Sequence, residues 1–240
     1  MALCYTRLVK TPVPTTIHGF SPPRIMPVYE KYRDGYFVSI SDSDRAAGLN
    51  YLATVYNGID LNLYPLREGA GDHLVFPGRI HPDKGVHLAI EVARRTGMRL
   101  VIAGIVQDHD YYRERVEPHL SETIRYIGAV DVAGKNRLFA MARALLHLNT
   151  IPERFGLVLA EANAAGVPVI AMDLGSCREV IEVGRTGFLV RDTHEAMAAL
   201  ERLGEIEGQA CRQRVEQRFS AETMVAGYEA VYETIFARER

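Results

Sequence analysis

The chain has 240 residues, of which 48% are hydrophobic, and this composition argues against disorder and for one large or two modest cores. Its 28 Lys and Arg residues nearly balance 30 Asp and Glu residues, so no overall positive field favours binding to nucleic acid. No uninterrupted run reaches the roughly 18 apolar residues that a membrane span needs. The cysteines Cys4, Cys177 and Cys211 are odd in number and far apart, which fits a reducing compartment. We therefore expect a cytoplasmic protein, with a peripheral association with the inner face of the membrane left open.

Short apolar, β-branched runs alternate with amphipathic helical patterns along the chain. The predicted strands are residues 12–18, 36–41, 52–57, 73–78, 99–104, 123–128, 144–148, 167–172 and 187–190. The clearest helix lies within residues 83–97 and ends at Gly97. Its apolar stripe consists of Val86, Ala89, Ile90 and Ala93. The alternation of strand and helix predicts an α/β fold with a parallel sheet.

The domain organisation follows from how the predicted elements are distributed. Residues 61–72 are rich in glycine and charge and lack periodicity, so we interpret them as a linker. Residues 73–203 hold enough strand–helix units for a complete Rossmann-like domain. Residues 1–60 have too little helix to cover both faces of a parallel sheet, so we expect an incomplete domain with one apolar face and a sheet edge open. Residues 204–240 predict a helical tail with Ser220 as a cap.

A candidate site lies in residues 149–166, NTIPERFGLVLAEANAAG, where a buried strand is followed by an apolar helix. Ligands of open parallel sheets bind beyond the strand ends, where helix N-termini offer N–H groups to anions. We expect a phosphate to be held by the backbone amides of Phe155, Gly156 and Leu157. Glu153 and Glu161 would then lie at two depths beside it, which suggests a sugar and a ribose joined by a diphosphate. The alternative is that Glu153 caps a helix and Glu161 is solvated.

A second candidate site lies in residues 76–90, FPGRIHPDKGVHLAI. Arg79 and Lys84 follow the strand end at Gly78 and precede the next helix. Two cations at that place can clamp a diphosphate, because Arg binds in a bidentate way and Lys acts as a point charge. The alternative is that both are ordinary loop charges.

Two Asp-x-Asp stretches, residues 42–44 and 108–110, resemble metal ligands in spacing only. We interpret the first as a strand end followed by a helix cap and the second as the start of a solvated helix. The sequence therefore gives no reason to expect a metal.

The motifs GRIHPDKG, IGAV, PERFGLVLAEANAAGVPVIA and GSCREVIEVGRTGFLV occur in this order. Together they resemble the donor-binding domain of the retaining glycosyltransferases of family 4, also called group 1. The resemblance covers at least residues 52–200 and implies the GT-B architecture of two Rossmann-like domains. Residues 73–203 would bind the nucleotide sugar, and TIHG and VSISDSDR would be the last strands of a truncated acceptor domain in residues 1–60.

The resemblance implies a role for each matching residue. Arg79 and Lys84 would bind the donor diphosphate and stabilise the leaving group. Glu161 would bind the ribose hydroxyls, and Glu153 would contact the donor sugar. The remaining implied contacts are Ile127 and Gly128 with the base, Gly78 and the amides of Phe155, Gly156 and Leu157 with phosphate or sugar, and His18 with the sugar from across the cleft. The alternative for His18 is a buried histidine satisfied by a neighbour.

The implied reaction is a metal-independent and cofactor-independent transfer of a hexose, with retention, from a UDP-, GDP- or ADP-sugar to a saccharide, lipid or small-molecule acceptor. A second interpretation is a donor-nucleotide-binding module, or half of a split enzyme, that needs a partner for the acceptor domain. A third is a nucleotide-sugar epimerase, for which no acid/base group stands out beyond His18 and the glutamates. Four explanations of the short first domain stay open: the chain is a fragment, it is a natural truncation, it is half of a split enzyme, or it forms a homodimer that closes the sheet.

Overall fold

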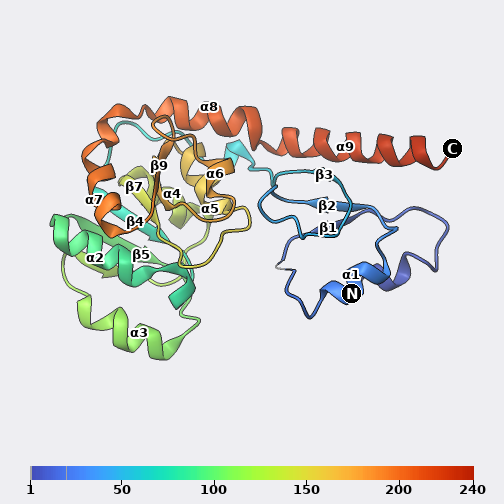
Figure 1. Ribbon diagram of the computed structural model, residues 1–240. Helices are drawn as coiled ribbons and strands as arrows, with labels where there is room; N and C mark the ends of the chain where they lie inside the picture. Colours follow the sequence, from blue (N-terminus) through green and yellow to red (C-terminus); the bar gives the residue numbers. More distant parts are fainter. Residues whose placement is uncertain (1, 20) are drawn as a thin grey trace.

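The computed structural model describes residues 2–19 and 21–240, and it consists of two lobes (Figure 1). The large lobe spans residues 61–218, and the small lobe spans residues 2–57, with Phe20 outside the described residues. All nine predicted strands are present, each within about three residues of its expected bounds. The predicted α/β class with parallel sheets is therefore confirmed.

The large lobe contains a six-stranded parallel sheet in the order β6-β5-β4-β7-β8-β9. Its strands are β4 (His73–Pro77), β5 (Arg99–Ala103), β6 (Ile124–Tyr126), β7 (Ala142–His147), β8 (Val169–Met172) and β9 (Gly187–Val190). Its helices are α2 (Val86–Thr96), α3 (His109–Arg115), α4 (Val132–Ala140), α5 (Leu157–Ala164), α6 (Cys177–Val180), α7 (Thr193–Glu201) and α8 (Gly208–Arg218). From β4 the chain adds β5 and β6 on one side of the sheet and then β7, β8 and β9 on the other side, so the strand order reverses between β4 and β7.

Both faces of this sheet are buried, which explains why its strands read as continuous apolar runs. Leu74 and Phe76 of β4 point into a core with α2 and α7, whereas Val75 points into the opposite core with α4, α5 and α8. The predicted stripe of α2 is buried, and Gly97 ends the helix with a φ of 69°.

The small lobe contains three parallel strands in the order β1-β2-β3. They are β1 (Thr15–Ile17), β2 (Phe37–Ser39) and β3 (Tyr51–Thr54), and the short helix α1 (Met26–Lys31) lies between the first two. The expectation of an open apolar face is wrong. Phe37 of the central strand packs in one cluster with Ile17 and Tyr29, and Val38 packs on the other face against the C-terminal helix. The edges of this small sheet, at β1 and β3, have no further neighbouring strand among the described residues.

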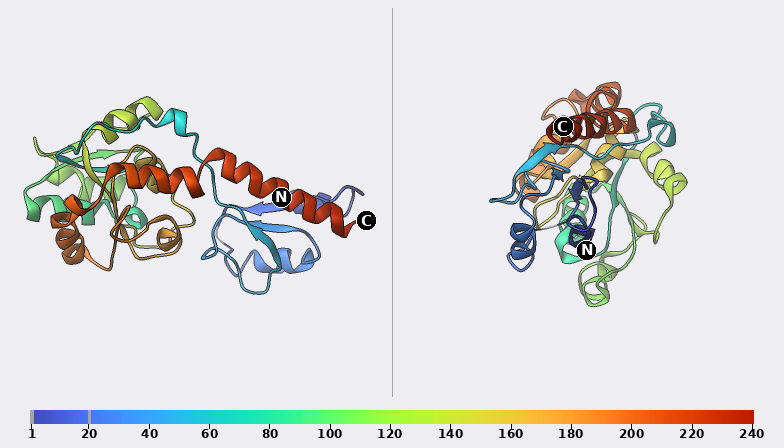
Figure 2. Two further views of the ribbon diagram at one scale, coloured as in Figure 1. Left: turned by 90° about the horizontal axis from the view of Figure 1, so that it is seen from above. Right: turned by 90° about the vertical axis from the view of Figure 1, so that its right-hand side faces the viewer.

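The covering helix is α9 (Ala221–Arg238), which leaves the large lobe and runs along the small lobe (Figure 2). Ser220 caps it as predicted, accepting a hydrogen bond from the Thr223 N–H at 3.1 Å. The crossing is anchored by Ile59, whose N–H donates to the Phe219 carbonyl at 2.7 Å and whose carbonyl accepts from the Ala221 N–H at 3.1 Å. Both chain crossings between the lobes are therefore tied together by backbone hydrogen bonds.

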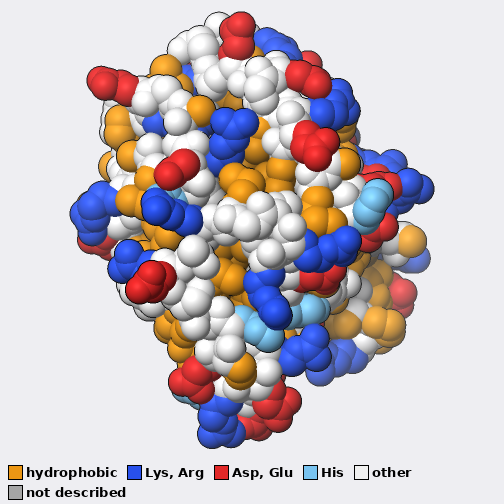
Figure 3. Space-filling model, turned by 90° about the vertical axis from the view of Figure 1, so that its left-hand side faces the viewer, with side chains coloured by type: hydrophobic (Ala, Val, Ile, Leu, Met, Phe, Trp, Pro, Cys, Tyr) orange, Lys and Arg blue, Asp and Glu red, His pale blue; other side chains and the backbone are white. Residues whose placement is uncertain are grey.

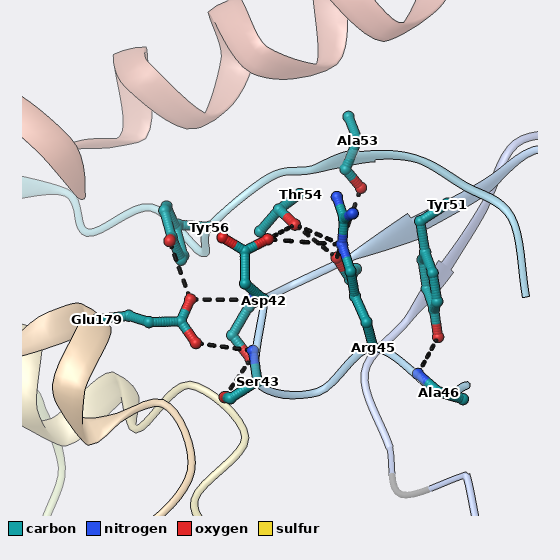
Figure 4. Close-up of polar contacts among 11 residues, drawn as sticks. Asp42, Ser43, Arg45, Ala46, Tyr51, Ala53, Thr54, Tyr56 and Glu179 are labelled. Carbon is teal, nitrogen blue, oxygen red and sulfur yellow. Dashed lines mark hydrogen bonds and ion pairs between the residues drawn. The ribbon is translucent and has the colours of Figure 1, made fainter.

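The two Asp-x-Asp stretches have different outcomes. Asp108 accepts a hydrogen bond from the Tyr111 N–H at 2.9 Å and caps α3, as predicted. No helix follows residues 42–44, so the predicted cap there is wrong. Asp42 instead accepts from the Thr54 hydroxyl (Figure 4). Asp44 forms an ion pair with Arg154 of the large lobe.

Within residues 2–19 and 21–240, no helix is long and apolar enough to cross a membrane. The same residues contain no group of three or more His, Cys, Asp or Glu side chains placed to hold a metal ion.

Candidate active site

A cleft of about 450 Å³ lies at the carboxyl ends of β4 and β7, where the strand order of the large sheet reverses. This is the place where open α/β sheets bind their ligands. The cleft is lined from the large lobe by residues 76–79, Lys84 and residues 153–158, and from the small lobe by His18, Ile40 and Asn57. Both lobes therefore contribute to one site.

Lys84 is positioned by a tight turn between β4 and α2. The turn is a 3₁₀ helix, Pro82–Lys84, in which the His81 ring accepts from the Asp83 N–H at 3.2 Å. Gly85 follows with a φ of 71°, and a Cβ atom there would lie only 1.8 Å from the Leu148 carbonyl oxygen. Only glycine permits this approach, which brings Lys84 against the end of β7.

Glu153 is the centre of the polar network in the cleft. Its Oε2 accepts from Lys84 Nζ at 2.8 Å, Asn149 Nδ2 at 2.7 Å and His147 Nε2 at 3.0 Å. Its Oε1 accepts from the Arg154 N–H at 3.0 Å. Because a carboxylate only accepts, His147 must carry its proton on Nε2.

The charge of Glu153 is strongly stabilised even though only 12% of its side chain is exposed. Burial raises its pKa, but the hydrogen bond and charge of His147 and the ammonium of Lys84 outweigh this and hold the pKa well below its usual range. Glu153 is therefore ionised and fixed, rather than a proton donor. The alternative that Glu153 caps a helix is wrong, because Gly156 is the N-cap residue of α5 and that cap has no side-chain hydrogen bond.

The start of α5 supplies backbone donors to the cleft. Gly156 adopts a φ of 77°, and α5 then begins at Leu157. Gly156, Leu157 and Val158 line the cleft, where the first N–H groups of a helix have no intrahelical acceptor. The Phe155 ring is buried and packs against Tyr56 and Phe219 at centroid distances of 6.1 and 5.6 Å. Phe155 thus anchors the loop, and only its backbone is free to contact a ligand.

Arg79 and His18 lie on opposite sides of the cleft. Arg79 is exposed and donates a hydrogen bond to the Gln107 side chain. His18 follows β1, is exposed, and lines the cleft from the small lobe. The alternative of a buried, satisfied histidine is therefore wrong.

Glu161 lies outside the lining of the 450 Å³ cleft. Its Oε1 accepts from Lys135 Nζ at 2.6 Å and from the Tyr64 hydroxyl at 2.8 Å. Its side chain is only 12% exposed, so the alternative of a solvated carboxylate is wrong. Burial and the bond to Glu161 raise the pKa of Tyr64, which keeps this hydroxyl protonated as a donor.

Ile127 and Gly128 also lie outside that cleft. The Gly128 carbonyl accepts from the Gly104 N–H at 2.8 Å, and Gly128 has a φ of 77°. Ile127 lines a separate hollow of about 300 Å³ together with Val130 and Arg137. The structure thus brings most of the predicted site residues together around one cleft: His18, Gly78, Arg79, Lys84, Glu153, Phe155, Gly156 and Leu157. Glu161, expected beside the ribose, and Ile127 with Gly128, expected beside the base, do not line it.

Two residues of the site, His147 and Asn149, were not singled out from the sequence. His147 lies within the apolar run ALLHL and looked like part of a buried strand, and Asn149 begins the candidate segment 149–166 but was given no role of its own. The available signal was their polarity at a strand's carboxyl end, where ligand-binding side chains gather. Asn149 has a further feature: its Oδ1 is buried and has no hydrogen-bond partner among the described residues.

Residues 67–218, more than half of the chain, match the family model for glycosyl transferases group 1. The chain belongs to the group 1 glycosyltransferases. A glycogen synthase of Mycobacterium tuberculosis is 31% identical over 208 residues, which are 77% of this chain and 49% of that protein. A phosphatidyl-myo-inositol mannosyltransferase of the same species is 28% identical and is matched over 98% of this chain and 67% of its own length. This group 1 chain thus spans about half the length of the glycogen synthase.

Solved structures support the same fold. The HepE protein of Anabaena, in complex with UDP and glucose, has a TM-score of 0.82 and 20% identity, covering 98% of this chain and 74% of that chain. Sucrose-phosphate synthase from Thermosynechococcus elongatus has a TM-score of 0.81 and 19% identity, covering 98% and 70%. These likenesses confirm the GT-B fold that we expected for this glycosyltransferase.

Proposed function

We propose that the chain acts as a retaining, metal-independent glycosyltransferase of family 4 that moves a hexose from a nucleoside diphosphate sugar to a saccharide, lipid or small-molecule acceptor. The observation that carries the proposal is the contact of Lys84 with Glu153 at the point where the strand order reverses. A cation and a carboxylate at that place match the two ends of a sugar diphosphate. The HepE structure with UDP and glucose supports a donor of this class.

The diphosphate would lie between Arg79, Lys84 and the first N–H groups of α5. Breaking the bond between sugar and phosphate develops negative charge on the β-phosphate and positive charge at the anomeric carbon. Fixed cations and amides aimed at the phosphate lower this barrier, because they need no rearrangement as the charge develops. The UDP-, GDP- or ADP-sugar is a substrate, and no cofactor takes part.

The sugar would lie against Glu153 and Asn149. Glu153 is held by His147, Asn149 and Lys84, so its position is defined before a ligand arrives. The unpartnered, buried Oδ1 of Asn149 offers an acceptor for a sugar hydroxyl. In this arrangement Glu153 orients the sugar and is not a nucleophile, and His18 approaches from the small lobe.

Glu161 is our candidate for the ribose, and Ile127 with Gly128 for the base. Binding would require the ribose hydroxyls to join or replace the bonds of Lys135 and Tyr64 to Glu161. If Glu161 selects ribose, Glu161→Ala should abolish a preference of UDP over deoxy-UDP. Equal binding of both nucleotides by the unaltered chain would exclude this role.

The test of the donor site is calorimetric titration with UDP, GDP, ADP and their sugar conjugates. We expect one nucleotide to bind selectively, and Lys84→Ala and Arg79→Ala each to weaken it at least about tenfold, the loss of a charge-assisted hydrogen bond. Arg113→Ala is the matched control, because Arg113 is exposed on α3 and pairs with Asp110. Unchanged affinity in both cleft variants would overturn the diphosphate clamp.

A second candidate function is a donor-binding module that turns over only with a partner providing the acceptor domain. The observation that favours it is the three-stranded sheet of the small lobe beside the six-stranded sheet of the large lobe. A homodimer or a separate chain would then pair with an open edge at β1 or β3, not with an apolar face. Transfer that depends on an added acceptor-domain chain would support this function, and transfer by the chain alone would exclude it.

A further inference from the structure

A hollow of about 370 Å³ lies on the outer surface of the large lobe, between α2 and the region of α3. It shares no lining residue with the 450 Å³ cleft. Basic and histidine side chains gather in the lower half of the face that carries these helices (Figure 3). The polar residues that line the hollow are His87, Glu91, Arg94, Arg95, Arg115 and His119.

The charges of the hollow are not balanced. Glu91 is the only carboxylate among its lining residues, and one oxygen of Glu91 already accepts from Arg95 at 3.1 Å and from the Thr193 hydroxyl at 3.0 Å. Within the described part of the chain, Arg94 and Arg115 have no carboxylate partner. Three guanidinium groups therefore share one recess with a single carboxylate, and this excess of positive charge is unfavourable unless an anion joins them.

The two histidines present hydrogen-bond donors. The Tyr111 hydroxyl accepts from the backbone N–H of His87 at 3.0 Å and lies 2.7 Å from Nδ1 of the His87 ring, to which it can donate its own proton. Arg94 Nη1, which can only donate, lies 3.4 Å from Nδ1 of His119. In each ring Nδ1 is thus an acceptor, and Nε2 is left as the N–H donor.

We propose that this hollow is a binding site for a phosphate group, held by Arg94 and Arg115 with His87 and His119 as further donors. Arginine suits a tetrahedral oxyanion because its planar fork makes two parallel hydrogen bonds. The phosphate can belong to a soluble anion or to a lipid headgroup. Burial and the charge of Arg115 lower the pKa of His87, so a bound phosphate should raise it.

The test is a titration with inorganic phosphate, followed by the imidazole resonances of the full chain. His87 and His119 report the hollow, whereas His18 and His147 report the cleft, so binding at the two places is resolved within one experiment. We expect the His87 and His119 resonances to move as phosphate is added. The phosphate affinity obtained from these shifts should fall at least about tenfold in the double variant Arg94→Gln, Arg115→Gln. Arg115→Gln alone should give a smaller loss, and it serves as the second variant.

The matched control is Arg113→Gln, which removes the same charge from α3 at a residue that does not line the hollow. Unmoved resonances, or an equal loss in Arg113→Gln, would overturn the site. Sedimentation with vesicles of phosphatidylcholine, with and without phosphatidylglycerol, identifies the source. Binding only to anionic vesicles that depends on Arg94 and Arg115 assigns a headgroup, and a response to phosphate without vesicle binding assigns a soluble anion.

Discussion

Oε2 of Glu179 lies 2.8 Å from the backbone nitrogen of Asp42, across the boundary between the two lobes (Figure 4). Its other oxygen accepts from the Ser43 N–H at 2.8 Å, and the Tyr56 hydroxyl donates to Oε2 at 2.9 Å. Burial and the bond to Glu179 raise the pKa of Tyr56 to about 12, so this hydroxyl stays a donor. One side chain of α6 thereby holds the loop after β2, whose first residue, Ile40, lines the cleft.

The first prediction concerns this contact. Glu179→Ala removes the acceptor of two backbone N–H groups, so we expect the Asp42 and Ser43 amides to exchange hydrogen faster. The free energy of the local opening that exposes them should fall by about 1–3 kcal/mol. Exchange measured by NMR should change little in β4 to β9. Glu205→Ala is the control, because Glu205 makes only an exposed ion pair with Arg202. Unchanged exchange at both amides would show that other contacts hold the loop.

The second prediction concerns the pH dependence of stability. Because the folded pKa of Glu153 lies below the unfolded value of about 4.3, the unfolded chain takes up this proton first as the pH falls. The stability that Glu153 contributes is thus complete above about pH 4.3 and is lost below it. Below that pH the unfolding free energy of the unaltered protein should fall as the solution is acidified. In Glu153→Gln this fall should be less steep, by up to about 1.4 kcal/mol per pH unit. Urea unfolding at several pH values measures the slope, and equal slopes in both proteins would contradict the prediction.

The third prediction separates close approach from backbone conformation. Gly85 and Gly97 have nearly the same φ, 71° and 69°, but a Cβ at Gly85 meets the Leu148 carbonyl at 1.8 Å, while nothing lies within 4 Å of one at Gly97. Gly97→Ala should lower the free energy of unfolding by only about 1–2 kcal/mol, the cost of placing alanine in the left-handed backbone conformation. Gly85→Ala adds a steric clash, for a total of about 3 kcal/mol or more, and moves Lys84.

Denaturant unfolding measures both costs, and nucleotide titration measures the effect on Lys84. We expect Gly85→Ala to weaken donor binding and Gly97→Ala to leave it unchanged. Equal destabilisation by the two substitutions would mean that the chain relaxes around Leu148 without strain.

The sequence predicted those parts of the fold that depend on local pattern. Apolar runs ending in polar loops defined every strand, and the cations and carboxylate at strand ends defined Arg79, Lys84 and Glu153. It did not predict that Lys84 and Glu153 touch, because this depends on β4 and β7 being neighbours in space. Residues 42–44 resembled a helix cap because their partners, Thr54 and Arg154, are distant in sequence.

The placement of α9 was also beyond the sequence. Its pattern predicts a helix with an apolar side, but that pattern is the same whichever sheet the helix covers. The structure shows Val231 and Ile235 packed with Val38 and Val55 of the small lobe. The C-terminal end of the chain thus takes the place that a crossover helix would have on this face of the small sheet.

The fourth prediction tests this replacement. Ile235 is 3% exposed and its neighbour Phe236 is 61% exposed, so the two positions differ in burial but not in the helix they belong to. Ile235→Ala should destabilise the small lobe by about 2–4 kcal/mol through lost burial and the cavity left behind, whereas Phe236→Ala should be close to neutral. Hydrogen exchange should therefore accelerate in β1 to β3 in the first variant only. If β4 to β9 exchange faster to the same extent, the two lobes unfold as one unit, and α9 stabilises the whole molecule rather than the small sheet.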